Sequence, residues 1–205
     1  MLDGALRRLI DPALDRAGAR LARHGVGADA LTLAGLVLGL ACAGAVVAGL
    51  DALALALLAA NRLCDGLDGA VARATRRTDR GGFLDIVLDF AFYGAVPLAF
   101  ALREPAANAL PAAVLLFAFY VNGASFLAFA AVAAKRGLET RVQGLKSIYF
   151  SAGLAEGFET ILVFAAMMAW PGHFALMAYA FAGLTLMSAL ARVALAWGAF
   201  RDEEG

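Results

Sequence analysis

The chain has few of the residues on which thiol and imidazole chemistry depends. Its 205 residues include 2 cysteines and 2 histidines, and charged residues make up 17% of the total. Cys42 and Cys64 lie in apolar sequence without the spacing of metal ligands, so we interpret them as small packing residues and expect no disulfide. His24 and His173 each stand alone beside a predicted loop. The sequence therefore does not predict a site built on cysteine or histidine.

The chain also lacks the alternation of apolar and polar residues that is typical of a transmembrane β-barrel. Its N-terminal stretch is polar and rich in arginine, without the apolar core of a secretory signal peptide. Apolar residues are abundant instead: they form 62% of the chain, and the mean hydropathy is +0.78. They occur in long runs separated by short charged segments. This pattern predicts an all-α integral membrane protein with several transmembrane helices.

An amphipathic stretch precedes the apolar segments. Residues 1–24 place leucines at helical spacing with arginines between them, which predicts a helix on the membrane surface, interrupted or capped near Pro12. Asp29 is expected to cap the next helix. We expect one domain over residues 1–205, with a six-helix bundle over residues 29–199. The six predicted transmembrane helices lie near residues 29–49, 52–76, 82–102, 109–135, 144–170 and 173–199.

Arginine and lysine gather on one side of these predicted helices. They cluster in the N-terminal stretch, after the second predicted helix and after the fourth, whereas the opposite connections contain only Arg103. Positive charge marks the cytoplasmic segments of a membrane protein. We therefore expect both termini and the active site to face the cytoplasm. The alanine-rich, lysine-poor composition suggests a bacterial inner (plasma) membrane.

Four aspartates lie within the segment DGLDGAVARATRRTDRGGFLDIVLD. Asp65 and Asp68 are three residues apart, and Asp85 and Asp89 are four apart, so each pair shares one face of a helix. A rise of about 1.5 Å per residue places both pairs at matching depths, about 5–10 Å above the cytoplasmic edge. Bare carboxylates at that depth are costly. The pattern predicts a site for Mg²⁺ or Mn²⁺ that takes a phosphate-bearing substrate.

Small residues and arginines accompany these acids. Gly69 and Ala72 extend the face of the first pair, where a flat ligand could approach the backbone closely. Arg73 and the arginines after it supply countercharge at the mouth of the site. Simple pairing between acids and arginines at a membrane edge explains the pattern less well, because one arginine-rich loop does not require two acid pairs at equal depth.

The segment resembles the signature of the CDP-alcohol phosphotransferase family. That signature reads D-x-x-D-G-x-x-A-R, a short spacer, and G-x-x-x-D-x-x-x-D. The spacer here is residues 74–80, one residue shorter than in the signature. The matching positions are Asp65, Asp68, Gly69, Ala72, Arg73, Gly81, Asp85 and Asp89.

The resemblance implies a fold, an activity and residue roles. The enzyme would transfer a phospho-alcohol group, most simply phosphatidyl, from a CDP-linked donor such as CDP-diacylglycerol to a small hydroxyl acceptor, with release of CMP. It would be a homodimer in the lipid membrane. Asp89 would serve as general base as well as metal ligand. The implied metal ligands are Asp65, Asp68, Asp85 and Asp89, and the implied donor-binding residues are Thr32, Gly69, Ala72, Arg73, Gly81 and Gly82.

Basic residues of the later helices are candidates for binding the acceptor. Lys146 and Arg192 lie toward the cytoplasmic ends of the fifth and sixth predicted helices. An anion pocket there would suit a phosphorylated alcohol. The alternative is that they only determine orientation, with the Arg192 side chain snorkelling to the interface.

Two acids in the fifth predicted helix have no assigned role. Glu156 and Glu159 are expected at membrane depth, where an acid usually faces the protein interior and has a partner. Asn122 and Ser125 are candidate partners.

Two other functions fit parts of the pattern. Aspartate-rich membrane prenyltransferases also use Mg²⁺ and a diphosphate donor, although their two motifs are well separated in sequence. A membrane transporter could use the acids as an ion path, although acids at equal depth on one side argue against it. No nucleic-acid partner is expected.

Overall fold

The computed structural model describes residues 2–136 and 157–200, and its regular elements are all helices. Four segments of the described chain are long and apolar enough to cross a membrane, and they contain α2, α4, α5 and α8. The prediction of an all-helical chain with several candidate membrane-spanning helices is thus confirmed for the described residues. The elements are α1 (Leu2–Arg23), α2 (Ala28–Val47), α3 (Asp51–Ala74), α4 (Asp79–Arg103), α5 (Pro105–Lys135), α7 (Gly157–Ala169), the short 3-10 helix η2 (Pro171–His173) and α8 (Phe174–Ala199).

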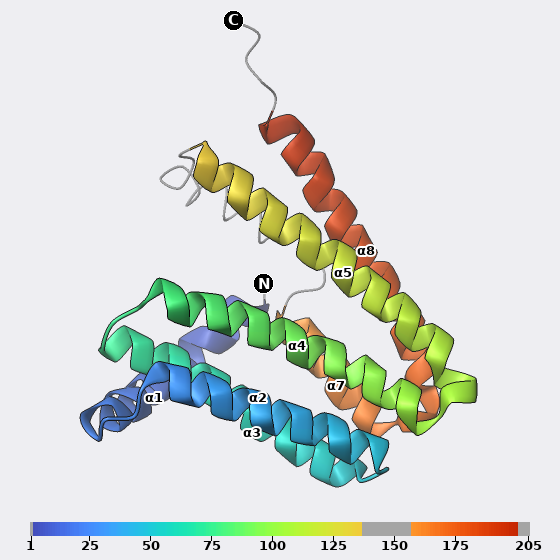
Figure 1. The fold of residues 1–205 in the computed structure, drawn as a ribbon, viewed down its shortest axis with the longest axis horizontal. Coiled ribbons are helices and arrows are strands. Elements are labelled where there is room, and N and C mark those ends of the chain that lie inside the picture. The colour runs from blue at the N-terminus through green and yellow to red at the C-terminus, as the bar shows by residue number, and fades with distance from the viewer. Residues whose placement is uncertain (1, 137–156, 201–205) are drawn as a thin grey trace, which may run out of the picture.

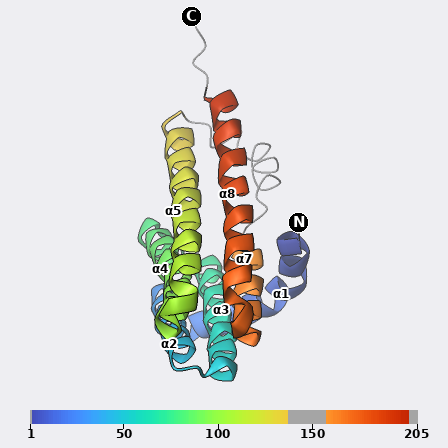
Figure 2. The same cartoon turned by 90° about the vertical axis from the view of Figure 1, so that its right-hand side faces the viewer.

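The helices form two groups that meet along α4 and α5. In the first group α2 packs against both α3 and α4, and α1 packs against α3. In the second group α5 and α8 lie side by side, and Figure 2 shows them rising together beyond the other described helices. Helix α7 packs against α3 and precedes α8. This arrangement places the C-terminal half of α3 beside the N-terminal half of α4, where the four aspartates lie (Figure 1).

Glycines allow the central helices to approach closely. A Cβ atom added at Gly39 of α2 would lie 2.6 Å from Cδ2 of Phe92 on α4, closer than real side chains approach. Phe92 is 1% exposed, and its ring meets the edge of Phe164 from α7 at 6.1 Å between centroids. Small residues at helix contacts are the usual means of tight packing in membranes, where water exclusion does not drive helices together. The core therefore depends on Gly39 as well as on its aromatic residues.

Ion pairs join the ends of these helices. Arg103 at the end of α4 pairs with Asp51 at the start of α3. At the other end Arg80 of α4 pairs with Asp29 of α2 at 2.6 Å. The end of α4 thus lies at the start of α3, and the start of α4 lies at the start of α2. Helices α3 and α4 therefore run antiparallel, so their aspartates can meet at one level.

Two local expectations were wrong. Helix α1 runs without a break through Pro12, which is exposed, although a proline inside a helix removes one backbone hydrogen bond. Asp29 does not cap α2: Gly27 is the N-cap, without a side-chain hydrogen bond, and Asp29 lies one residue inside the helix. Its carboxylate instead forms an ion pair with Arg80 of α4, which is distant in the sequence.

Candidate active site

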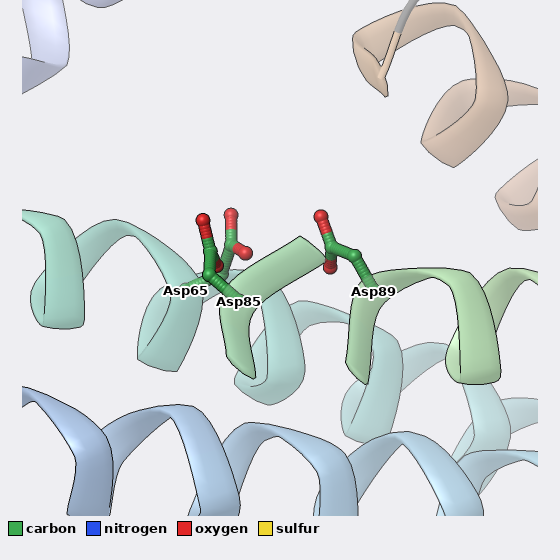
Figure 3. Close-up of side chains that lie close together, drawn as sticks. All are labelled: Asp65, Asp85 and Asp89. Atoms are coloured by element: carbon green, nitrogen blue, oxygen red, sulfur yellow. The ribbon is translucent and has the colours of Figure 1, made fainter. Parts of the chain in front are cut away.

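Three of the four predicted metal ligands meet between α3 and α4. Asp65 comes from α3, whereas Asp85 and Asp89 come from successive turns of α4. One carboxylate oxygen of each lies within 4.8 Å of the others. Figure 3 shows the three side chains projecting to the same side of their helices. We call these residues the aspartate cluster.

The chemistry of the aspartate cluster fits a divalent metal. Its donors are carboxylate oxygens, which hard cations such as Mg²⁺ prefer, and Mg²⁺ commonly combines one or two carboxylates with phosphate oxygens. Asp65 and Asp89 are partly buried and Asp85 is exposed. The cluster is therefore open on one side, where phosphate oxygens of a substrate could complete the coordination.

Asp68 lies beside the cluster and is held differently. Its residue is 7% exposed, and its Oδ2 accepts a hydrogen bond from the Thr32 hydroxyl of α2 at 2.8 Å. That hydroxyl also lies 3.1 Å from the carbonyl oxygen of Ala28. Thr32, predicted to lie near the donor phosphates, is thus in direct contact with a predicted metal ligand.

A larger cavity adjoins the aspartate cluster. It has a volume of about 620 Å³, within the usual range for small-molecule sites. Its walls come from the start of α2, the end of α3 and the start of α4. Asp68 and Asp85 line both this cavity and the small space beside the cluster. All six predicted donor-binding residues line it: Thr32, Gly69, Ala72, Arg73, Gly81 and Gly82.

The walls of this cavity, which we call the donor cavity, combine glycines with arginines. A Cβ atom at Gly82 would meet nothing within 4 Å, so the backbone there borders open space. Four arginines, Arg73, Arg76, Arg77 and Arg80, line the same cavity as Asp68 and Asp85. A ligand with a flat base and a diphosphate would find small residues for the base and positive charge for the phosphates.

Arg73 also ties α1 to the site. Its Nε and a terminal nitrogen donate to Oδ1 of Asp15 at 3.0 and 2.7 Å. Nearby, a Cβ atom at Gly18 would lie 2.8 Å from the backbone carbon of Ala70, so α1 touches the α3 backbone. Helix α1 is therefore packed against the helix that carries the first half of the signature.

Sequence reasoning missed Arg62, which pairs with two acids of the aspartate cluster. Its guanidinium nitrogens lie 3.1 Å from Asp89 Oδ1 and 3.5 Å from Asp65 Oδ2. One available signal was its position three residues before Asp65, on the same helix face. A second was its place within an apolar helix, where a charged residue is expected to have a partner.

Arg192 lies in another part of the protein. It lines a cavity of about 680 Å³ between α5 and α8, which shares no lining residue with the donor cavity or with the space beside the aspartate cluster. One of its terminal nitrogens donates to Oδ1 of Asn122 and to the Ser125 hydroxyl, both at 2.7 Å. The structure therefore does not bring Arg192 to the predicted donor site. Lys146, its predicted companion, is outside the described residues.

The predicted partners of the two glutamates contact this arginine. Asn122 and Ser125 both accept hydrogen bonds from Arg192. Glu156 is outside the described residues. The Oε2 atom of Glu159 is buried, and it has no hydrogen-bond partner among the residues that the structure describes.

Comparison with known proteins points in one direction. The model of the CDP-alcohol phosphatidyltransferase family matches residues 26–200. The inner membrane protein YnjF of Escherichia coli is 45% identical over 193 residues, which cover 94% of each chain. The crystal structure of Mycobacterium tuberculosis phosphatidylinositol phosphate synthase with CDP-DAG bound matches with a TM-score of 0.65 at 19% identity, over 94% of this chain and 98% of that one. At that identity the likeness shows the fold.

Proposed function

The chain belongs to the CDP-alcohol phosphatidyltransferase family, and we propose that it transfers a phosphatidyl group from CDP-diacylglycerol to the hydroxyl of a small alcohol, with release of CMP. The observation that carries this proposal is the junction of the aspartate cluster with the donor cavity, where Asp68 and Asp85 line both spaces. The solved structure that shares the fold holds CDP-DAG, which supports the choice of donor. Membership of the family sets aside the prenyltransferase and transporter alternatives.

The residues of the donor cavity have complementary tasks in this proposal. Gly69, Ala72, Gly81 and Gly82 leave room for the cytosine base to approach the backbone. Arg73 lies near the nucleotide, while its contact with Asp15 holds α1 against the site. The diacylglycerol chains would extend into the membrane.

The aspartates place the reacting groups. A divalent cation, Mg²⁺ or Mn²⁺, held by Asp65, Asp85 and Asp89 with Asp68 beside them, would stabilise negative charge on the diphosphate. Asp89 accepts the proton of the acceptor hydroxyl. The hydroxyl oxygen then bonds to the phosphorus that carries diacylglycerol, and the bond from that phosphorus to the bridging oxygen breaks. That oxygen and its electron pair leave with CMP.

The acceptor would approach from the side of α5 and α8. We assign Arg192 and Lys146 to binding a phosphorylated acceptor such as glycerol phosphate or inositol phosphate, with serine as a further acceptor to be tested. The support is the position of the Arg192 guanidinium in a cavity lined by both helices, together with its hydrogen bonds to Asn122 and Ser125.

The membrane arrangement completes the proposal. We assign residues 1–205 to one domain with six transmembrane helices, α1 on the membrane surface, and a homodimeric assembly. We place the protein in the inner membrane, which the name of the Escherichia coli relative supports. We place its active site toward the cytoplasm, which the arginines at the α3–α4 end of the bundle support. Labelling of an Arg76→Cys variant without its native cysteines should occur from the cytoplasmic side; labelling from the outside alone would reverse the orientation.

The activity can be tested by CMP release from CDP-diacylglycerol. Purified protein is incubated with Mg²⁺ and each acceptor in turn, alongside Asp89→Asn and the control Asp79→Asn, whose aspartate is exposed on the same helix and outside both cavities. We expect acceptor-dependent release that chelation with EDTA abolishes. Asp89→Asn should lower it by about a hundredfold or more, as loss of a general base does.

Two results would contradict the proposal. Equal activity in Asp89→Asn and Asp79→Asn would exclude the role of Asp89. Absence of CMP release with every acceptor, from folded protein, would exclude CDP-diacylglycerol as the donor and direct the search to soluble CDP-alcohols.

A further inference from the structure

Arg62 is a partly buried cation that none of these steps uses. Its side chain is 20% exposed, and its guanidinium bridges Asp65 on α3 and Asp89 on α4. Both acids belong to the aspartate cluster, so a positive charge already lies against two of the three carboxylates that could hold a metal. A divalent cation must therefore bind next to Arg62.

The Arg62 guanidinium is held by a hydrogen bond to its neighbour Asn61 and by two aromatic rings. Its Nε donates to Oδ1 of Asn61 at 2.7 Å, and Asn61, which is 3% exposed, donates through Nδ2 to the carbonyl oxygen of Gly35 on α2 at 2.7 Å. The ring centroids of Phe92 and Tyr93 lie 5.2 and 5.9 Å from its central carbon. Three helices thus hold Arg62, and it cannot turn away from the acids without breaking several contacts.

Such a fixed cation has two consequences for the aspartate cluster. A planar guanidinium that donates to one oxygen of a carboxylate sets the orientation of that carboxylate. Here it donates to Oδ1 of Asp89, which leaves the second oxygen for another partner. Its charge also repels any metal ion that binds the same acids, and in a partly desolvated site this repulsion is strong.

On the basis of the proposed transferase function, we propose that Arg62 is a positioning residue that orients Asp89 for the reaction and weakens the binding of divalent metal by the aspartate cluster. The diphosphate of the donor adds negative charge and offsets that repulsion. Metal and nucleotide therefore bind with positive cooperativity, each raising the affinity of the other by the same factor.

The test compares metal binding with turnover. Mn²⁺ is titrated into purified protein in detergent micelles, and free Mn²⁺ is measured by electron paramagnetic resonance, with and without CDP, which carries the diphosphate of the donor. CMP release from CDP-diacylglycerol is then measured with the same protein preparations. The variants are Arg62→Gln and Arg62→Lys. The matched control is Arg103→Gln, which removes an arginine of similar burial from an ion pair between the start of α3 and the end of α4.

The expected pattern separates positioning from a merely structural role. Without nucleotide, Arg62→Gln should bind Mn²⁺ at least about tenfold more tightly than the wild type, because the repulsion is gone. Its kcat should nevertheless fall about tenfold, because Asp89 loses a charge-assisted hydrogen bond. Arg62→Lys should keep the wild-type Mn²⁺ affinity and still lose kcat, since an ammonium cannot hold Asn61 and Asp89 in one plane. Arg103→Gln should change neither.

Every other outcome either supports or overturns the inference about Arg62. Unchanged or weaker Mn²⁺ binding by folded Arg62→Gln would overturn the inference. If that variant does not fold, Arg62→Lys decides: reduced kcat at unchanged affinity supports the inference, and unchanged kcat overturns it. A wild type that neither binds Mn²⁺ nor releases CMP would refute the proposed function and this inference with it. A wild type that does both, beside variants that behave like it, would refute the inference alone.

Discussion

Replacement of Gly39 by alanine tests how tightly the core supports the active site. The added Cβ atom would lie 2.6 Å from Cδ2 of Phe92 and 3.2 Å from Nδ2 of Asn61. Phe92 has little freedom to move, because it is 1% exposed and packs against Phe164. The substitution therefore forces α2 and α4 apart or displaces the Phe92 ring.

The magnitude follows from two opposing effects. Overpacking of a well-packed core costs about 1–3 kcal/mol. Alanine in place of glycine favours a helix by about 0.5–1 kcal/mol. Gly44 lies on the same helix, and a Cβ atom there would meet nothing within 4 Å. The helix preference is common to Gly39→Ala and Gly44→Ala, so the difference between the two variants isolates the clash, at about 1–3 kcal/mol.

Unfolding in mixed micelles of mild detergent and dodecyl sulfate measures this difference. We expect Gly39→Ala to unfold at the lower dodecyl sulfate fraction and Gly44→Ala to match or exceed the wild type. CMP release should fall in Gly39→Ala alone, because Phe92 and Asn61 both contact Arg62. Equal unfolding midpoints for the two variants would show that α2 and α4 do not approach as closely as the structure indicates.

Two further predictions concern Thr32 and α1. Thr32→Val removes the hydroxyl that donates to Asp68 at 2.8 Å. Loss of a hydrogen bond to a charged group should lower the rate of CMP release by about tenfold or more, whereas Thr32→Ser keeps the hydroxyl and should keep the rate. Equal rates in the two variants would refute the role of this hydrogen bond. Gly18→Ala places a Cβ atom 2.8 Å from the backbone of Ala70, which cannot move aside as a side chain would. Limited trypsin digestion should therefore cleave α1 faster in this variant than in the control Gly27→Ala, whose added Cβ atom meets nothing within 4 Å. A cleavage rate equal to that of Gly27→Ala would mean that α1 is not held against α3.

Much of the fold could be predicted from local patterns. The apolar runs predicted α2, α4, α5 and α8 to within a few residues, because the length needed to cross a membrane is set by the helical rise. The start of α4 was misplaced, since Thr78 accepts a hydrogen bond from Gly81 and begins the helix outside the apolar run. The continuity of α1 through Pro12 and the pairing of Asp29 depend on surroundings that periodicity does not describe.

The sequence by itself determined the family and the identity of the four aspartates. Spacings of three and four residues place side chains on one helix face whatever the rest of the chain does, so the pairing of Asp65 with Asp68 and of Asp85 with Asp89 was readable directly. Only the tertiary structure decided which partners each of the four aspartates has. Three acids gather in the aspartate cluster, where Arg62 pairs with two of them, and the fourth, Asp68, accepts a hydrogen bond from a threonine of α2. That division depends on which helices pack together and how closely glycine lets them approach, and these are contacts between residues far apart in the chain.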